Sequence, residues 1–507
     1  MGNIIYVLKN HGFNAGGKSE VLGTIFEKKR IDKVLNINTY LWVIRMENVK
    51  KIFVIGLDSA PPELLFNRFL NDLPNIKKLL EKSIYGPMQS TIPAITIPAW
   101  MVMATGKTPG ELGLYGFRHR KKGTYNDIWI AHSLMIKEKA IWDYLGEIGK
   151  KSILVGVPPS YPLKPINGCS VSCFITPDAS VDYTCPKELK SEIENLVGEY
   201  IFDVVFRRDD RDKVKEKLWE MTKKRFEVIR YLIQEKDWDY FQFVDIGLDR
   251  VHHAFWKYFD ENHHLHEPGS EYQNVIYEYY KLLDKEIGET LKLLDLNETA
   301  VAIVSDHGIK AMKGAFAINQ WLIEEGLLKI KNPEILKEGR QIRFEELDVD
   351  WNKTIAWAWG GYYSRIFLNV KGREPNGIIK PENYHTVRNE VAKLVKTIRG
   401  PNGEKWNTKV FYPEDIYPVA KSDRPDMMVY LDDLNWRAAG TLGYETPYLL
   451  ENDTGPDDAV HSEYGVFSLY LPGMEESKQI NSTIYDFAPT ILKLFGIEKP
   501  LRGRSVL

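Results

Sequence analysis

The sequence predicts an α/β protein with a mostly parallel central sheet between two helical layers. Two observations support this fold class. Short apolar runs of strand length recur along the chain, and amphipathic stretches of helix length separate them. Runs that lack polar alternation are typical of strands buried on both faces, as parallel strands are. A length of 507 residues could hold two or three average domains, but large α/β proteins also use such a length as one elaborated unit.

The strands are predicted from runs in which apolar residues dominate. The first reads Ile-Phe-Val-Ile-Gly-Leu and is followed directly by Asp58. Two prolines close the second run, because proline cannot donate a hydrogen bond to a sheet. The five predicted strands are Ile52–Leu57, Lys151–Val157, Trp238–Val244, Thr299–Ser305 and Val466–Leu471.

Helices are predicted where apolar residues recur at helical spacing or where residues that begin helices stand. The longest stretch, Lys213–Glu235, places Leu218, Met221 and Phe226 near one side. Thr96 and Pro98 are residue types that begin a helix. The five predicted helices cover residues 96–105, 213–235, 249–258, 275–294 and 482–496.

The alternation of strand and helix fails in two regions. Residues 1–45 show no clear periodicity, and we expect them to be an extension that the core does not need. Residues 311–450 contain many tryptophans and loop-forming Pro, Asn and Gly. We therefore predict an α/β core built from 46–310 and 451–507, with 311–450 as an inserted, cap-like region against its active face.

Composition restricts the class of protein. Apolar residues make up 44% and charged residues 27%, which is typical of a globular chain. The net charge of −3 offers no basic footprint for a nucleic acid polymer or an anionic membrane surface. No apolar run reaches the ~18 residues that span a bilayer, and no secretory pattern is present, so we expect a cytoplasmic protein. Of the three cysteines, Cys169 and Cys173 are predicted to be buried thiols, not metal ligands.

Acidic residues and histidines follow the predicted strands. Asp58 ends the first strand, Asp306 and His307 end the strand at 299–305, and Asp249 comes shortly after the strand at 238–244. In a doubly wound sheet, functional residues gather at the carboxyl ends of the strands. Carboxylate and imidazole together form the mixed donor set that zinc or manganese accepts. The alternative for Asp306 and His307 is an ordinary turn.

Three further residues complete the candidate site. Asp249 and His253 are four apart on a predicted helix and project from one face, as a chelating pair or as a simple surface pair. Thr96 stands at a helix start, where a negative oxygen is favoured, although an ordinary N-cap threonine would look the same. His461 follows two aspartates and is either a ligand or an exposed loop histidine.

The chain resembles the alkaline-phosphatase superfamily, in particular its type I phosphodiesterase/nucleotide pyrophosphatase branch. The resemblance covers most of residues 50–507. The segments that carry it are Gly56-Leu-Asp58, Thr96-Ile-Pro-Ala-Trp100, Asp249-Arg-Val-His-His253, Ser305-Asp-His-Gly308, His461-Ser-x2-Gly-Val-Phe467 and Asp486-x-Ala-Pro-Thr-Ile-Leu492.

This resemblance implies an alkaline-phosphatase-like three-layer sandwich and a phosphoric ester hydrolase with two divalent metal ions. Zinc is favoured by the three histidines, with manganese as the alternative. By resemblance, one ion is held by Asp249, His253 and His461. The other is held by Asp58, Asp306 and His307, with Thr96 as nucleophile and bridging ligand.

The chain departs from the branch at two positions. Ala99 stands where nucleotide pyrophosphatases carry an asparagine, and Pro109-Gly-Glu-Leu-Gly113 lacks their histidine. No arginine accompanies Thr96, which favours diesters over monoesters because a diester has fewer charged oxygens to bind. We therefore expect a small phosphate ester or nucleotide as substrate, whereas the sequence does not indicate an oligomeric state.

Other readings of the same residues remain open. A phosphomonoesterase, a phosphonate hydrolase or a phosphomutase would use the same metals. A transferase for lipid-linked substrates is disfavoured because no membrane segment is present. A non-catalytic metal-stabilised binding protein would be expected to lose a ligand or the nucleophile, and every expected residue type is present.

Overall fold

A ten-stranded sheet forms the centre of the region that this computed structural model describes, residues 49–507. In spatial order its main path is β22 (Lys478–Gln479), β2 (Ser83–Gln89), β21 (Tyr464–Tyr470), β9 (Thr299–Val304), β1 (Lys51–Leu57), β8 (Tyr240–Asp245), β5 (Ser152–Val155), β6 (Gly168–Val171) and β7 (Thr184–Cys185), and β23 (Ser482–Thr483) pairs with β2.

The middle of the sheet is parallel. Strand β1 pairs in parallel with β8 on one side and β9 on the other, and β5 and β6 continue the parallel order. Antiparallel pairs occur where β21 joins β2 and β9, and where β7 joins β6. The prediction of a mostly parallel sheet is therefore confirmed.

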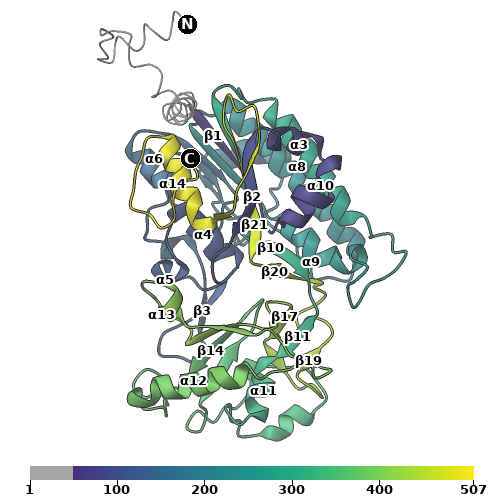
Figure 1. The fold of residues 1–507 in the computed structure, drawn as a ribbon, viewed down its shortest axis with the longest axis vertical. Coiled ribbons are helices and arrows are strands. Elements are labelled where there is room, and N and C mark those ends of the chain that lie inside the picture. The colour runs from purple at the N-terminus through teal and green to yellow at the C-terminus, as the bar shows by residue number, and fades with distance from the viewer. Residues whose placement is uncertain (1–48) are drawn as a thin grey trace, which may run out of the picture. The chain divides into compact units, whose positions relative to one another are not determined.

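Helices cover both faces of this sheet (Figure 1). One layer contains α3 (Pro74–Leu80), α8 (Arg211–Glu235), α9 (Gly247–Phe259) and α10 (Val275–Leu291), with α7 (Leu189–Val197) against α8. The other contains α4 (Thr96–Thr105), α6 (Ile141–Glu147) and α14 (Phe487–Leu494), with the short α5 (Pro109–Leu112) beside α4. This is the three-layer arrangement that the sequence predicts.

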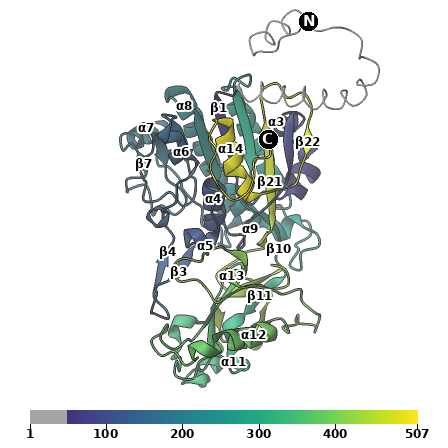
Figure 2. The same ribbon diagram turned by 60° about the vertical axis from the view of Figure 1, so that its left-hand side comes forward.

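Residues between β9 and β21 build several small sheets, which lie beside the carboxyl ends of the parallel strands of the central sheet (Figure 2). A four-stranded sheet has the order β13 (Ala356–Trp359), β14 (Ser364–Leu368), β16 (Met427–Tyr430), β15 (Lys409–Phe411), and a three-stranded sheet has the order β17 (Trp436–Ala439), β11 (Gly314–Ala317), β19 (Tyr448–Leu449). Two pairs are β12 (Ile342–Arg343) with β18 (Thr441–Leu442) and β10 (Gly308–Ala311) with β20 (Ala459–Ser462). The helices here are α11 (Ile318–Glu324), α12 (Tyr384–Val395) and α13 (Pro413–Ile416).

The part of this region between β10 and β20, which we call the cap, has a hydrophobic core of its own. The cluster runs from Phe316 to Leu442 and includes the fully buried Trp357. A second, smaller cluster joins the cap to the α/β part and includes Ile95, Tyr115, Tyr363 and Tyr430. The hairpin of β3 (Arg118–Arg120) and β4 (Ile128–Ile130) also reaches the cap from the α/β part. Where the two parts divide along the chain, at 311 and 450, stays a prediction.

One predicted element is wrong at its start. The helix expected over 482–496 begins only at Phe487, because Ser482–Thr483 pairs with β2 as strand β23 and a 3₁₀ turn follows over Ile484–Asp486. Thr483 donates its backbone N–H to the Asp486 carboxylate at 2.8 Å, so the capping residues serve this turn and not the predicted helix.

Three other sequence expectations can be compared with the structure. Cys169 and Cys173 are buried free thiols, as predicted. Among residues 49–507, no helix is both long and apolar enough to cross a membrane. The prediction that residues 1–45 are a dispensable extension lies outside the described residues.

Candidate metal centre and nucleophile

The predicted acidic residues meet at the carboxyl ends of three neighbouring parallel strands. Asp58 follows β1, Asp306 and His307 follow β9, and Asp249 lies in the first turn of α9 after β8. Because β1 is in parallel register with both neighbours, these strands end at the same edge of the sheet. All four side chains are buried.

His461 and Thr96 come to this edge from other elements. His461 lies on β20, where it is paired with Ile309 of β10, so the strand that follows His307 brings it to the site. Thr96 is the first residue of α4, and Ile95 occupies the N-cap position. The Thr96 hydroxyl therefore does not serve as an N-cap, which excludes the alternative of an ordinary N-cap threonine. It lies 3.3 Å from Nε2 of His307.

Each of the three carboxylates has one oxygen held by a donor and one oxygen without a hydrogen-bond partner. Trp100 donates to Asp58 Oδ2 at 2.7 Å, and the backbone N–H of Ser59 donates to Asp306 Oδ1 at 3.3 Å. Arg250 donates to Asp249 Oδ2 at 2.7 Å. The opposite oxygens have no partner among the described residues: Asp58 Oδ1, Asp249 Oδ1 and Asp306 Oδ2.

The three imidazoles are fixed in the same way. His307 Nδ1 lies 3.0 Å from the Gly308 carbonyl, and His461 Nδ1 lies 2.9 Å from the Ala94 carbonyl. His253 Nδ1 lies 2.7 Å from the Asp457 carboxylate. A carbonyl or carboxylate at Nδ1 requires the proton there, so in a neutral ring the lone pair lies on Nε2.

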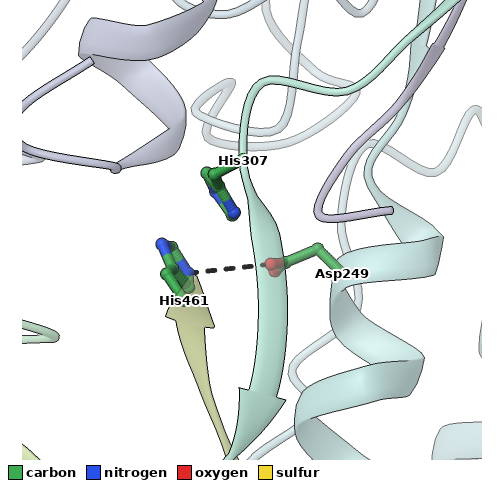
Figure 3. A group of neighbouring side chains, drawn as sticks. All are labelled: Asp249, His307 and His461. Carbon is green, nitrogen blue, oxygen red and sulfur yellow. Dashed lines mark ion pairs between the residues drawn. The ribbon is translucent and has the colours of Figure 1, made fainter. Parts of the chain in front are cut away.

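The free atoms group into two sets. Ligand atoms of Asp58, Asp306 and His307 all lie within 4.8 Å of one another, and so do those of Asp249, His307 and His461. Figure 3 shows the second set, in which His461 Nε2 lies 3.8 Å from Asp249 Oδ1. The first set is the trio that the sequence predicts.

The second set differs from the predicted trio of Asp249, His253 and His461. His307 takes the place of His253, because the His307 ring stacks on that of His461 with 3.8 Å between ring centroids. His253 is nevertheless adjacent, with its Nε2 3.3 Å from Asp249 Oδ1 and no hydrogen-bond partner. The structure thus brings all the predicted site residues together, and which of them ligate a metal stays a prediction.

The electrostatics of this cluster divide its residues. Burial opposes the charged form of His253, but Tyr362, Asp457 and Asp249 outweigh it and raise the pKa of His253 well above the ordinary value, and the His253 charge helps to hold the pKa of Asp249 low in spite of burial. Burial, followed by the neighbouring carboxylates, raises the pKa values of Asp58 and Asp306 well above the ordinary value. Burial lowers the pKa of His307 to about 4 and that of His461 well below its ordinary value, so both imidazoles are neutral. Neutral imidazoles and carboxylates with unused oxygens in a buried site are the donor set for a divalent metal ion. The residues present therefore fit the predicted metals.

Asp457 and the two arginines that bind it support the metal centre through His253, and the sequence did not predict this role. Asp457, fully buried, accepts from His253 and also from Arg207 at 2.8 Å and Arg437 at 3.0 Å. The positive neighbours outweigh burial and hold the pKa of Asp457 well below its ordinary value. The only signal in the sequence was the acidic pair just before His461.

We expect Asp457→Asn to weaken metal binding about tenfold to a hundredfold, because an amide fixes the His253 tautomer less firmly than a carboxylate does. Metal affinity measured by competition with a coloured chelator tests this. Asp458→Asn is the matched control, since Asp458 is equally buried but contacts His253 only through its backbone N–H, 2.9 Å from the His253 carbonyl. Equal effects of both changes would contradict a specific role for Asp457.

Tyr362 closes the centre from the cap side. Its ring stacks on His461 at 4.1 Å and on His253 at 4.9 Å between centroids, and its hydroxyl lies 3.2 Å from Asp457. The Arg437 guanidinium covers the ring at 4.7 Å. Tyr362 is partly exposed, whereas the histidines beneath it are buried. The cap therefore supplies one wall of the site, and no motif in the sequence indicated this residue.

Ser59 and His252 form another missed pair. Ser59 adopts a left-handed backbone conformation (φ 61°) that turns its N–H toward Asp306, and its hydroxyl lies 2.9 Å from His252 Nδ1. A non-glycine residue at positive φ next to a candidate metal ligand is a typical site of functional strain. His252 thus supports Asp306 indirectly, through Ser59.

The fold has three layers around a mostly parallel sheet, and this constellation lies at the ends of its central strands. A family model for type I phosphodiesterase/nucleotide pyrophosphatase matches residues 52–457. The chain belongs to the type I phosphodiesterase/nucleotide pyrophosphatase family.

Solved structures agree with this fold. Murine ectonucleotide pyrophosphatase/phosphodiesterase 5 matches with a TM-score of 0.52 at 13% identity, covering 89% of this chain and 97% of the murine chain. An inactive variant of the murine protein, with threonine replaced by alanine and in complex with AMP, gives the same TM-score and identity over 90% and 97%. The human protein gives a TM-score of 0.51 at 13% identity over 89% and 97%. No curated protein matches the chain in sequence.

Proposed function

We propose that this protein is a two-metal phosphodiesterase or nucleotide pyrophosphatase in which Thr96 is the nucleophile. One observation carries the proposal. Three buried carboxylates and His253 each use one side-chain atom in a hydrogen bond and leave the other without a partner, beside a threonine hydroxyl that caps no helix. Such a set is costly in a protein interior unless it binds cations.

The metals would be held by Asp58, Asp306 and His307 on one side and by Asp249, His253 and His461 on the other. When bound, they supply positive charge that stabilises the attacking and leaving oxygens of an in-line displacement. Zinc is the expected ion because of the three imidazoles, and manganese is the alternative.

Thr96 then forms and breaks one covalent bond in each cycle. Its Oγ1 attacks phosphorus, the bond to the leaving group breaks, and the departing alcohol carries away the hydroxyl proton. Water next attacks the phosphorus of phospho-Thr96, which releases the monoester and restores the hydroxyl. The N-terminus of α4 lies at Thr96, where backbone N–H groups and the helix dipole favour the negative phosphoryl oxygens.

The arginines around the site favour a diester. Arg250 is held by Asp203 and Asp249, and both Arg207 and Arg437 are held by Asp457. All three are already paired with carboxylates, which weakens their attraction for the additional charged oxygen of a monoester. The AMP complex of the murine relative supports a nucleotide-like substrate for this chain, and that relative's inactive threonine variant supports Thr96 as nucleophile.

We expect the metal-loaded protein to hydrolyse bis(4-nitrophenyl) phosphate with a higher kcat/KM than 4-nitrophenyl phosphate, by about tenfold or more. Release of nitrophenolate measures both reactions under the same conditions. A preference for the monoester would favour a phosphomonoesterase instead. The same metals and nucleophile serve both reactions, so that outcome would change the substrate class and leave the site assignment intact.

A further inference from the structure

Two arginines at the seam between cap and α/β part lack a carboxylate partner. Arg365, on β14, is 7% exposed, and Arg118, on β3, is exposed. Among residues 49–507, no carboxylate oxygen lies within 4.0 Å of either guanidinium. Arg365 donates to the Arg118 carbonyl, and its Nε has no partner. A buried guanidinium without a counter-charge is costly, so this arrangement calls for an explanation.

Arg120 lies two residues after Arg118 in the β3–β4 hairpin and is a buried arginine with a structural role. It shows that such an arginine in this protein is paired with carboxylates. Its guanidinium donates to Glu374 at 2.6 Å and 3.1 Å, and to Asp423 as well. Both Arg120 and Arg365 lie over aromatic rings of the cap. The missing acid at Arg365 is therefore a property of this position and not of buried arginines in this protein.

The surroundings of Arg365 supply a further hydrogen-bond donor, and they leave space beside its guanidinium. Arg365 donates to the Arg118 carbonyl, so the two residues are adjacent, and burial together with the positive charge of Arg118 lowers the pKa of Arg365. His119 accepts from the Tyr115 N–H through Nε2, so its proton is on Nδ1, which has no partner. Beside the Cα of Gly116, a methyl group would meet only the Arg365 guanidinium within 4 Å, at 3.7 Å from Nη1.

This position is connected to the metal centre through the cap. Tyr362 stacks on His461, and Arg365 follows three residues later. Three residues of extended chain span at most about 10 Å. Tyr363 lies between them and packs in the cluster that contains Ile95, the residue before Thr96. Arg365 is thus linked to the residues around Thr96 through its chain neighbours Tyr362 and Tyr363.

We propose that Arg365 and Arg118 form a subsite for a second anionic group of the substrate, a phosphate or carboxylate beyond the phosphorus that reacts. A guanidinium group matches the planar geometry and the charge of such an anion, and a second positive side chain adds to the attraction. This inference rests on the proposed function and narrows it: the preferred diester carries an extra negative charge at one end.

A matched pair of diesters tests the subsite. In 4-nitrophenyl 4-carboxyphenyl phosphate, a carboxylate replaces one of the two nitro groups of bis(4-nitrophenyl) phosphate at nearly constant shape. We expect the wild-type kcat/KM to be about tenfold or more higher for the carboxylate ester. Arg365→Met should abolish this preference and leave bis(4-nitrophenyl) phosphate hydrolysis unchanged, and Arg365→Lys should retain part of it.

Arg399→Met is the control for net charge, since Arg399 is an exposed cap arginine whose guanidinium has no ion pair among the described residues. It should leave the preference intact. Equal losses for both esters in Arg365→Met, or no preference in the wild type, would overturn the subsite. If neither ester is hydrolysed, the proposed function fails, and calorimetric binding of the two esters to the metal-loaded Thr96→Ala protein still decides the subsite by the same comparison.

Discussion

Thr96→Ala is expected to lower kcat for diester hydrolysis by at least about a thousandfold, since it removes the atom that attacks phosphorus. Metal content and melting temperature should stay close to those of the wild type. The Thr96 side chain makes one polar contact, to His307, and α4 has its N-cap at Ile95. Steady-state kinetics with bis(4-nitrophenyl) phosphate and metal analysis of the purified variant measure these effects.

Thr96→Ser is the matched control for this change. The hydroxyl remains, and we expect partial activity. Loss of the methyl group frees χ1, so the hydroxyl adopts the orientation for attack less often. If Thr96→Ala instead retains full turnover, a covalent phospho-threonine is excluded, and direct attack by water on the diester would be the remaining route.

Asp306→Asn is expected to reduce activity at least about a thousandfold by removing a carboxylate oxygen from one metal set. The same change should raise the melting temperature of the metal-free protein. In that form the pKa of Asp306 is raised by burial and by the carboxylate of Asp58, so folding takes up a proton there. The stability of the metal-free wild type should therefore fall as pH rises above the unfolded pKa of Asp, about 4.

Thermal unfolding of chelated wild-type and Asp306→Asn proteins at pH 5 and pH 8 measures this effect. The difference between the two proteins should be larger at pH 8, because the asparagine does not titrate. Asp295→Asn serves as control, since Asp295 is an exposed residue in the turn before β9. A metal-free variant that is less stable than the wild type at pH 8 would contradict a cluster that needs cations.

The sequence was sufficient to predict those parts of the molecule that local patterns specify. Apolar runs such as Ile52–Leu57 identified the central strands, and the residues that follow them identified Asp58, Asp306 and His307. Parallel pairing then brings these residues together, since strands in register end at one edge.

The remaining features depend on contacts between distant segments. Tyr362 reaches His461 only because the loop between β13 and β14 lies against the site, and a single tyrosine in a loop carries no motif. Arg365 looks ordinary in sequence, since its missing partner is visible only after the hairpin and the cap meet. The start of α14 was mispredicted because Ser482 and Thr483 are drawn into a pairing with β2, nearly 400 residues earlier.

Crystals of the protein grown with zinc, and anomalous diffraction recorded on both sides of the zinc absorption edge, would locate the metals directly. We expect two peaks about 3.5–4 Å apart, one beside Asp58, Asp306 and His307 and the other beside Asp249, His253 and His461. Thr96 Oγ1 should lie next to both. A single peak, or peaks elsewhere in the molecule, would contradict the two-metal centre and with it the proposed phosphodiesterase mechanism.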